Sequence, residues 1–519
     1  MPQTSRPVPA TLFPAATGRR TTPERNRAAG RVRWPSWLLT YEAAAVAVVL
    51  LSVVARLHSG LTAPLWFDEA WTGALSSQKS WVALFHQIYD DVNAPLYYVV
   101  MFVWAKGFGL SNLALRAPNI IFGVLASGFA FFGVKRLSGT AAVAWCMLLA
   151  SWAPGLLQSN DARCYGLLFL TATCASAAFA QLIATPTRKR ALVWVAAASL
   201  ALLTHYYAVF LLAAQAAVLL TVRRTAILRL WPAALGFAPA MAWTLFHLPR
   251  VLAFSRPDVA WYARLPIGRA PFELCYVFGA LPFFYAALAV MILAVTARLT
   301  RGGPERIGDE KLEPLFAACA ASLIGLVLCL AEGVVRPSFT ERYLTVFVPG
   351  ALLGVAIAAS YARGRFRTAP ALVVGGALLT LVAFIRTPVV ANDFSFEGAS
   401  TFLSEADPQR LVFLWDNPTA AIDAPEQLSA VGGFFFARMG RPVQTVPVYL
   451  AKGADPNRAL MALATPRSAI LWVYDFAIHD TAAKRFPPRL PQLDPRWTCR
   501  NFASDGIGVI ACRQPRPTP

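Results

Sequence analysis

The chain has 519 residues, of which 57% are hydrophobic and only 14% are charged, and its formal net charge is +20. Soluble globular proteins carry about 25% charged residues, so this composition excludes a protein that faces water on all sides, as well as collagen-like and disulfide-rich scaffolds. The basic residues form short clusters between long apolar runs, which is typical of loops beside anionic lipid and not of a nucleic-acid interface. We therefore expect a polytopic membrane protein whose partner is the lipid bilayer and not nucleic acid.

Residues 1–36 are polar and arginine-rich, which predicts a disordered cytoplasmic tail. The apolar run at 37–57 is too long for a cleaved signal peptide, so we expect an uncleaved first helix. Further runs are about long enough to cross a hydrocarbon core of roughly 30 Å. They lie at 117–134, 140–158, 164–184, 191–204, 206–222, 230–248, 273–297, 314–333, 342–361 and 368–388. These runs predict a membrane all-α domain over 37–388 with about eleven transmembrane helices.

The segment 95–109 is apolar but short, and the positive-inside rule decides its placement. If it spans, the later basic clusters fall on the side opposite the basic N-terminus. If it does not span, they all fall on the N-terminal side. They are Lys135/Arg136, Arg188 to Arg190, Arg223/Arg224, the 298–311 loop and Arg363/Arg365/Arg367. We therefore expect 95–109 to be an interfacial helix in an external loop, 58–116, with the N-terminus in the cytoplasm.

Residues 389–519 then lie outside as well, and they predict a small α/β domain. RLVFLW, RPVQTVPV and SAILWVYDF favour strands, and PEQLSAVGGFFFARM and NRALMALA favour helices. Cys499 and Cys512 are the only cysteines of this domain and flank a predicted terminal hairpin, so an oxidising compartment would permit a disulfide between them. The spacing of the cysteine and histidine residues indicates no zinc or haem site.

Ionisable residues are costly beside apolar segments, so their positions indicate a site. Here they gather at the expected outer ends of the spans. The groups are Asp68/Glu69, then Asp90/Asp91 with Asn93, then Arg116, then Asp161/Arg163, then His205 with Tyr206 and Tyr207, and finally Arg336, Glu341, Arg342 and Tyr343. These groups are far apart in sequence, and we expect them to share one side of the membrane.

Each group also has an ordinary structural explanation. Asp68 could cap an interfacial helix, Arg116 could be a snorkelling anchor, and His205 could belong to an aromatic belt. The remaining groups could be structural ion pairs or solvated loops. A single site explains all of them together.

One carboxylate with several cations suits group transfer from an anionic lipid. The carboxylate could act as a general base towards an acceptor hydroxyl or amine. Arginines could hold a phosphate through charge-assisted hydrogen bonds, and a phosphate leaving group needs its negative charge stabilised. Soluble glycosidases instead use two opposed carboxylates. The pattern therefore favours glycosyl transfer from a polyprenyl phosphate.

At these residues the sequence resembles the GT-C integral-membrane glycosyltransferases, in particular the group with protein O-mannosyltransferases, the lipid A aminoarabinose transferase and rhizobial lipopolysaccharide sugar transferases. The resemblance covers about 37–388. The segments that carry it, in the family's order, are WFDEAWT, APLYYVVMFVWAKGFGLSNLALRAPNIIFG, SNDARCYGLLFL, LLTHYYAVFLLAAQ and TERYLTVFVPG. The chain departs from the family at Asn93-Ala94-Pro95, where members often have His-Pro-Pro or Lys-Pro, and 389–519 carries no catalytic motif of the family.

The resemblance implies an inverting glycosyltransferase of the bacterial inner membrane that takes its sugar from a polyprenyl-phosphate carrier at the periplasmic face. It implies that Asp68 is the catalytic base and that Glu69 supports it. The residues that would line the pocket for the donor lipid phosphate are Arg116, Asp161, Arg163, His205, Tyr206, Arg342 and Tyr343. No cofactor is implied, and a divalent cation bound with the donor phosphate stays open.

The acceptor is expected to be a glycolipid or envelope polysaccharide, because the sequence shows none of the extra lumenal domains of eukaryotic protein O-mannosyltransferases. Transfer to a protein Ser/Thr hydroxyl is the alternative. A lipid or solute transporter is more remote, since transporters tend to have repeated halves around a midplane site and this chain shows no such repeat. A non-enzymatic membrane scaffold is the last alternative.

Overall fold

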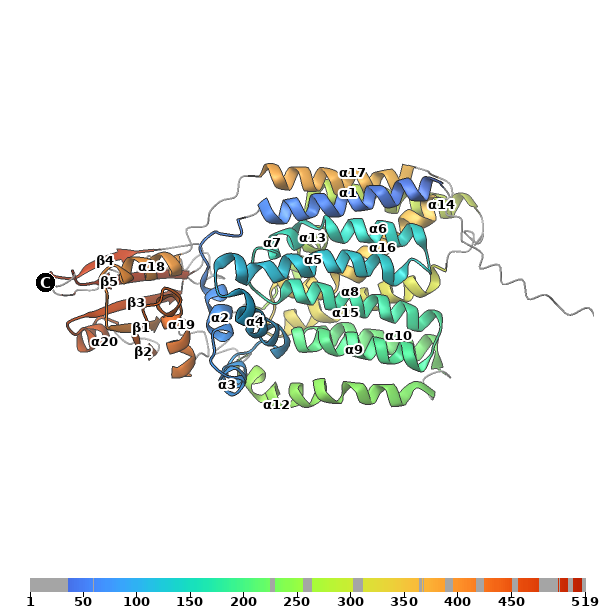
Figure 1. Cartoon of the computed structure of the whole chain (residues 1–519). Coiled ribbons are helices and arrows are strands. Elements are labelled where there is room, and N and C mark those ends of the chain that lie inside the picture. The colour runs from blue at the N-terminus through green and yellow to red at the C-terminus, as the bar shows by residue number, and fades with distance from the viewer. Residues whose placement is uncertain are drawn as a thin grey trace, which may run out of the picture.

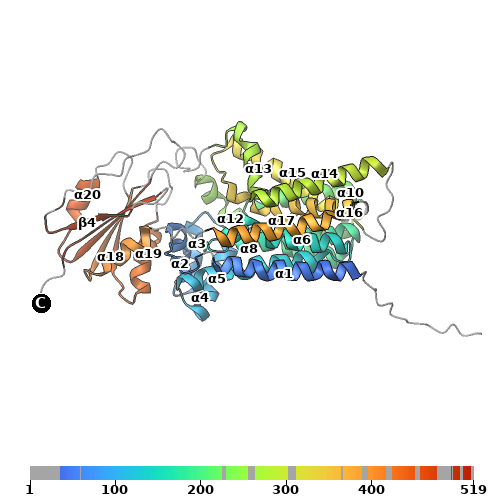
Figure 2. The ribbon, with the colours of Figure 1, turned by 90° about the horizontal axis from the view of Figure 1, so that it is seen from above.

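The computed structural model describes residues 36–58, 60–224, 229–254, 264–301, 311–363, 366, 368–387, 395–416, 424–449, 456–475, 493, 495–502 and 507–515. A bundle of helices forms one part of the molecule and a small domain with a sheet forms the other (Figure 1). A second view shows the same division, with short helices between the two parts (Figure 2). Except for Ser36, the tail expected over 1–36 lies outside the described residues.

Helical segments occupy every apolar run that the sequence predicts to span. The α-helices are α1 (Ser36–His58), α5 (Asn112–Val134), α6 (Gly139–Ala150), α7 (Ala153–Gln158), α8 (Tyr165–Ala184), α9 (Arg188–Thr204), α10 (Ala208–Val222), α12 (Ala238–Phe254), α13 (Ala270–Phe278), α14 (Leu281–Arg301), α15 (Glu313–Val335), α16 (Val348–Arg363) and α17 (Thr368–Arg386). The 3-10 helices are η1 (Trp231–Phe237), η2 (Ile267–Arg269) and η3 (Glu341–Val346).

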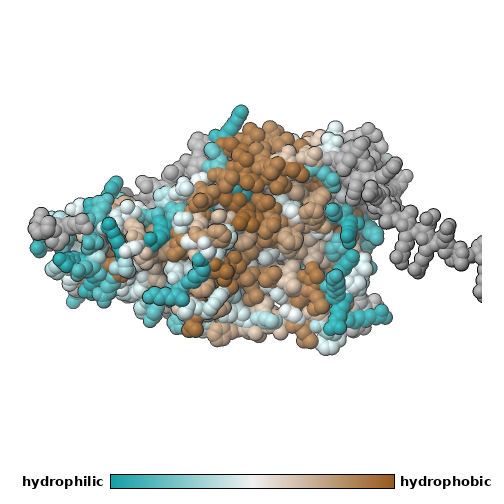
Figure 3. Space-filling model, viewed as in Figure 1, coloured by the Kyte–Doolittle hydropathy of each residue, from teal (hydrophilic) through white to brown (hydrophobic). Residues whose placement is uncertain are grey.

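Among the described residues, 5 helices are long and apolar enough to cross a membrane, or up to 6 if one bent pair is a single span. The five lie in α1, α5, α8, α15 and α17, and α6, α10 and α16 are shorter apolar helices. A hydrophobic belt crosses the bundle, with hydrophilic residues on both sides (Figure 3). The number of eleven spans therefore stays a prediction.

Two of the runs expected to be continuous are each broken into two α-helices. The run 140–158 divides into α6 and α7, and Pro154 in the first turn of α7 has no N–H to donate to the carbonyl of Ala150, where α6 ends. The run 273–297 bends by 95° between α13 and α14. Gly279 sits at this bend with φ +67°, and a Cβ there would lie 2.5 Å from Pro154 Cδ. The two breaks thus pack against each other.

The first long loop folds into three short helices at one end of the bundle (Figure 1). These are α2 (Phe67–Ser76), α3 (Trp81–Asp90) and α4 (Pro95–Phe108). The Ser80 side chain caps α3 by accepting from the Ala83 N–H, and α4 begins at Pro95, which suits the first helical position. The segment 95–109 is therefore a helix of 14 residues at the end of the bundle.

Hydrogen bonds tie the basic clusters together at the opposite end of the bundle. The Lys311 N–H donates to the Leu137 carbonyl at 2.7 Å, and Arg363 donates to a side chain in the first turn of α6 at 2.8 Å. Arg190 and Arg223 donate to carbonyls near the C-terminal end of α8, at 2.8 and 3.0 Å. The clusters that the positive-inside rule places in the cytoplasm thus lie at one end, away from α2 to α4.

The placement of these two ends predicts a labelling pattern. In a variant without the native free cysteines, Lys79→Cys before α3 should react with a membrane-impermeant maleimide added outside the cell, whereas Lys189→Cys at the start of α9 should react only after permeabilisation. Both side chains are exposed. Labelling of both positions from the same side would contradict the expected orientation.

The C-terminal part contains a five-stranded sheet in the order β2-β1-β3-β5-β4. Its strands are β1 (Arg410–Asp416), β2 (Gln444–Tyr449), β3 (Ser468–Asp475), β4 (Thr498–Asn501) and β5 (Ile507–Arg513), and its helices are α18 (Ser395–Ser404), α19 (Pro425–Arg438) and α20 (Pro456–Leu463). Strands β2, β1 and β3 are parallel, and β5 and β4 are antiparallel to their neighbours. The expected strands and helices of an α/β domain are confirmed, and α18 was not predicted.

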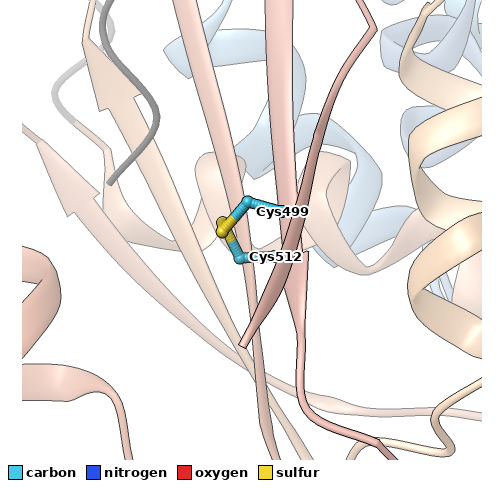
Figure 4. The surroundings of a disulfide bond; sticks show 2 residues. All are labelled: Cys499 and Cys512. Carbon is cyan, nitrogen blue, oxygen red and sulfur yellow. A yellow bond between two sulfur atoms is a disulfide. The ribbon is translucent and has the colours of Figure 1, made fainter. Parts of the chain in front are cut away.

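Alternation along β1 assigns the two faces of the sheet. Leu411, Phe413 and Trp415 belong to a core that includes α18, α19 and α2, whereas Val412 and Leu414 pack with α20. The terminal hairpin is formed by β4 and β5, in which Cys499 is the register partner of Cys512. These two cysteines form a disulfide (Figure 4).

Candidate active site

Asp68 lies in the first turn of α2, and two arginines from distant segments face its carboxylate. Arg163 Nε and Arg342 Nη1 are each 3.9 Å from Asp68 Oδ2. Arg163 precedes α8, and Arg342 lies in η3. The fold therefore brings together an acid and two cations that stand at positions 68, 163 and 342 of the sequence.

These three side chains are only loosely engaged with one another. Charge-assisted N–H···O bonds are about 2.7–2.9 Å long, so the separation of 3.9 Å is a weak pairing. The exposed fractions are 14% for Asp68, 12% for Arg163 and 27% for Arg342. Arg163 Nε has no hydrogen-bond partner among the described residues. The cluster thus keeps both an accessible carboxylate and an N–H donor.

Other contacts fix where the two guanidinium groups lie. Arg163 Nη1 donates to the Asp68 main-chain carbonyl at 3.2 Å. The Arg342 guanidinium carbon lies 5.6 Å from the Trp66 ring centroid and 5.4 Å from that of Tyr165, at cation–π distance. The arginines are held by the backbone and by aromatic faces, so their position does not depend on the carboxylate of Asp68.

Glu69 and Arg116 form a separate, buried ion pair. Arg116 donates to the Glu69 carboxylate from Nε at 2.7 Å and from Nη2 at 2.5 Å. The Glu69 carboxylate also accepts from the Ala162 N–H at 2.8 Å and the Trp66 N–H at 3.2 Å. Arg116 further donates to the carbonyls of Gly60, Leu61, Ala63 and Pro64. The pair therefore joins the loop before α2, helix α5 and the segment before α8.

Asp68 and Glu69 are adjacent in sequence but differ in their exposure to solvent. The Glu69 side chain is 0% exposed and the Arg116 side chain is 3% exposed. All three guanidinium nitrogens of Arg116 donate to protein oxygens. Asp68 is accessible and Glu69 is enclosed. Arg116 lies beneath the Asp68 loop, with its donors directed at the protein.

Asp161 lies beside the cluster and is held by two neutral donors. Its Oδ1 accepts from Trp66 Nε1 at 3.0 Å. The Asn119 side-chain amide donates to the main-chain carbonyls of Asp161 and Arg163, the latter at 2.9 Å. Burial, and next the charge of Glu69, raise the pKa of Asp161 to about 7. This carboxyl group therefore changes its charge near neutral pH.

The rings of His205 and Tyr343 pack against each other in a tilted arrangement next to the same arginines. Their ring centroids are 4.6 Å apart, and Tyr343 is 4.5 Å from Tyr207. Burial, followed by the charges of Arg163 and Arg342, lowers the pKa of His205 to about 3. Its Nδ1 accepts from the Tyr207 N–H at 3.3 Å, which assigns the ring proton to Nε2. His205 is thus a neutral donor at physiological pH.

Helix α12 contacts Tyr206, one of the residues predicted to line the pocket. Its hydroxyl lies 2.6 Å from His247 Nδ1 and accepts from Trp243 Nε1 at 3.0 Å. Among the described contacts, none joins Tyr206 to the Asp68 cluster. The Asp91 and Asn93 side chains likewise bond to each other, with Asn93 Nδ2 3.1 Å from Asp91 Oδ2. These residues stabilise the turn between α3 and α4.

Several residues of the site were not singled out from the sequence. Trp66, Tyr165 and Asn119 lie within the quoted motifs, but they carry no charge, and the predicted site rests mainly on charged residues. Arg56 was not predicted for a different reason: it lies at the end of an apolar run, where an arginine is expected to face the membrane surface. Its side chain is fully buried and donates to Ser159 Oγ at 2.9 Å and to the Ala150 carbonyl at 3.2 Å. It thus satisfies a carbonyl at the break between α6 and α7.

The arrangement suits an anion next to a carboxylate. Arg163 and Arg342 provide positive charge, and His205 Nε2 provides a neutral N–H. In the part of the chain that the structure describes, no group of three or more His, Cys, Asp or Glu side chains could hold a metal ion. The described side chains can therefore bind an anionic group and accept a proton at Asp68.

Comparison with solved structures identifies the fold. The chain is similar to ArnT from Cupriavidus metallidurans in the apo state, with a TM-score of 0.58 and 14% identity over 92% of this chain and 97% of that one. It is also similar to the same protein bound to undecaprenyl phosphate, with a TM-score of 0.56 and 13% identity over 92% and 98% of the two chains. The chain therefore has the GT-C fold expected from its motifs. No family model and no curated protein matches its sequence.

Proposed function

We propose that this chain is an inverting membrane glycosyltransferase that moves a sugar from a polyprenyl-phosphate carrier to an acceptor at the periplasmic face of the inner membrane. The observation that carries the proposal is the juxtaposition of Asp68 with Arg163 and Arg342, from three distant segments, at the end of the bundle away from the basic loops. The GT-C fold supports it, as does the binding of undecaprenyl phosphate by the similar ArnT. A glycolipid or envelope polysaccharide is the favoured acceptor.

The proposed reaction is a single displacement at the anomeric carbon. The acceptor hydroxyl or amine forms a bond to this carbon from the side opposite the phosphate and gives its proton to Asp68. The bond between the anomeric carbon and the phosphate oxygen breaks, and the phosphate leaves with the electron pair. Arg163 and Arg342 stabilise its growing negative charge, and His205 Nε2 is an additional donor. One displacement inverts the configuration of the sugar.

In this proposal Glu69 and Arg116 are positioning residues. The family resemblance implies that Arg116 binds the lipid phosphate, but its three guanidinium nitrogens donate to Glu69 and to loop carbonyls. Asp161 adjusts the charge next to the two arginines, and Tyr343 packs behind His205. Tyr206 is assigned to the contact with α12 and not to the donor.

Mass spectrometry of envelope glycolipids and glycans tests the proposed function directly. A deletion strain should lack one sugar unit that its parent carries, and the full chain supplied on a plasmid should restore it. The molecule that loses the sugar unit identifies both the sugar and the acceptor. Loss of a sugar from a Ser or Thr side chain of a protein would favour the alternative acceptor. Identical glycolipids, glycans and glycoproteins in the two strains would contradict glycosyl transfer and leave transport as the alternative.

Arg342 should be required for binding of the lipid phosphate. Hydrogen bonds to charged groups contribute about 1.5–3 kcal/mol, so Arg342→Ala should lower the affinity of the purified protein for undecaprenyl phosphate about 10-fold or more. Arg336→Ala is the matched control, because this exposed arginine lies six positions away at the end of α15. Equal affinities of the two variants would remove Arg342 from the pocket.

The raised pKa of Asp161 predicts a pH dependence. Protonation of this carboxyl group below about pH 7 removes one negative charge beside the two arginines, whereas above pH 7 its negative charge repels a phosphate. Wild type and Asp161→Asn should therefore bind undecaprenyl phosphate about equally at pH 6, and the Asn variant should bind more tightly at pH 8. The titration of the ligand itself cancels in the ratio of the two affinities. A ratio that does not change with pH would contradict the assignment.

A further inference from the structure

The segment that carries Asp68 is held from outside the bundle by the C-terminal domain. Phe67, the residue before Asp68, is 7% exposed. Its ring stacks on Trp415 of β1 with centroids 5.0 Å apart and meets the edge of Phe396 of α18 at 5.4 Å. The side chain next to the proposed base is thus part of the core of the C-terminal domain.

A polar contact holds the backbone of the same segment. The Leu65 N–H donates to Glu397 Oε2 of α18 at 2.6 Å. Glu397 is paired with Arg438 of α19, and Asn112 Nδ2 donates to the same Glu397 oxygen at 3.0 Å. Asn112 Nδ2 also donates to the Ala63 carbonyl at 2.9 Å. The carboxylate of Glu397 therefore fixes the loop three residues before Asp68.

The loop depends on these contacts because it has little structure of its own. Residues 61–66 precede α2, and their carbonyls are bonded on the inner side by Arg116. The outer side is bonded by Glu397 and covered by Trp415. The Asp68 carboxylate itself makes only 3.9 Å pairings. Its position therefore follows from the backbone that carries it.

We infer that the C-terminal domain is a positioning element of the active site, and that Trp415 and Glu397 set the location of the Asp68 carboxylate relative to Arg163 and Arg342. The inference rests on the proposed function, since it assumes that Asp68 is the base. A misplacement of about 1 Å can cost about 10²-fold in rate. Loss of these contacts should therefore lower turnover while the arginines, which lie in other segments, still bind the lipid phosphate.

The test uses full-length Trp415→Leu and Glu397→Gln, with Trp415→Phe as the conservative variant that keeps a ring against Phe67. Phe402→Leu is the matched control, because the described contacts of the Phe402 ring are with Phe502 and Arg513, within the same domain. Turnover is the rate of sugar transfer in the complemented deletion strain, per amount of folded protein. Affinity is measured on the purified proteins with undecaprenyl phosphate as the probe.

Trp415→Leu and Glu397→Gln should lower turnover about 10-fold or more, with affinity for undecaprenyl phosphate within about 2-fold of wild type. Trp415→Phe and Phe402→Leu should stay near wild-type turnover. Hydrogen exchange of the main-chain amides of residues 60–72 should be faster in Trp415→Leu than in Phe402→Leu, and this measurement does not depend on the proposed enzymatic activity. Wild-type turnover or unchanged exchange in Trp415→Leu would overturn the inference, as would equal losses in the Phe402 control.

The proposed function fails on a different result. If Asp68→Asn transfers sugar at the wild-type rate, Asp68 is not the base, and the inference about its positioning falls with that assignment. If Asp68→Asn is inactive and Trp415→Leu is normal, only the inference is wrong. If no variant and no wild-type strain shows transfer, the exchange measurement still decides whether the C-terminal domain orders the loop.

Discussion

Replacement of Asp68 by Asn should lower sugar transfer by about 10³-fold or more while the protein folds and binds undecaprenyl phosphate as before. The amide has the shape of the carboxylate but cannot accept the proton of the acceptor. Asp68 Oδ2 makes no contact shorter than 3.9 Å with either arginine, so little folding energy depends on its charge. The measurement is turnover per folded protein, with affinity for the lipid phosphate measured in parallel.

Two controls make the Asp68 result specific. Asp90→Asn changes an acid at the end of α3, outside the cluster, and should leave turnover unchanged. Asp68→Glu keeps the acid but moves it by one methylene, so it should retain part of the activity. Full activity of Asp68→Asn, or an equal loss in Asp90→Asn, would exclude Asp68 as the base.

Removal of the Arg116 guanidinium should have the largest effect on stability. Arg116→Met leaves the Glu69 carboxylate buried without its partner, and removal of one member of a buried ion pair costs about 3–5 kcal/mol. The carbonyls of residues 60, 61, 63 and 64 lose a donor at the same time. We expect a clear fall in the thermal unfolding midpoint in detergent and faster hydrogen exchange over 60–70. Arg188→Met, an exposed arginine of α9, is the control.

A double variant separates a positioning role from a phosphate-binding role. The double variant Glu69→Gln/Arg116→Met removes both charges. Its loss of unfolding free energy should therefore be smaller than the sum of the losses in the two single variants. If Arg116 instead contacts the donor, Arg116→Met should keep its unfolding midpoint and lose affinity for undecaprenyl phosphate. That outcome would restore the assignment made from the sequence.

The helices and strands could be predicted from the sequence, because membrane-spanning helices need long apolar runs and buried strands need short ones. Every apolar run became helical, and 95–109 became a short helix at the end of the bundle. The strands at 410–416 and 468–475 carry continuous apolar residues, as central parallel strands do. The charged residues at one end of the predicted spans also indicated that Asp68, Arg163 and Arg342 lie close together, as the structure shows.

The roles of individual charges were harder to predict. Arg116 and Arg342 look alike in sequence, but one is enclosed by carbonyls and the other lies between two rings. The difference arises from the path of the loop at 60–66, which has no periodic pattern. The break at Gly279 depends on contact with Pro154, more than a hundred residues away. Long-range packing of this kind leaves no local signal.

The enclosed guanidinium of Arg56 has a consequence for the first helix. A helix that served only as an anchor could be exchanged for any apolar segment of equal length. This one donates to Ser159, two residues before Asp161, and to the end of α6. Chimeras that swap α1 for a foreign membrane segment would therefore remove a specific link to the end of the bundle that carries the Asp68 cluster, even when insertion and orientation are preserved.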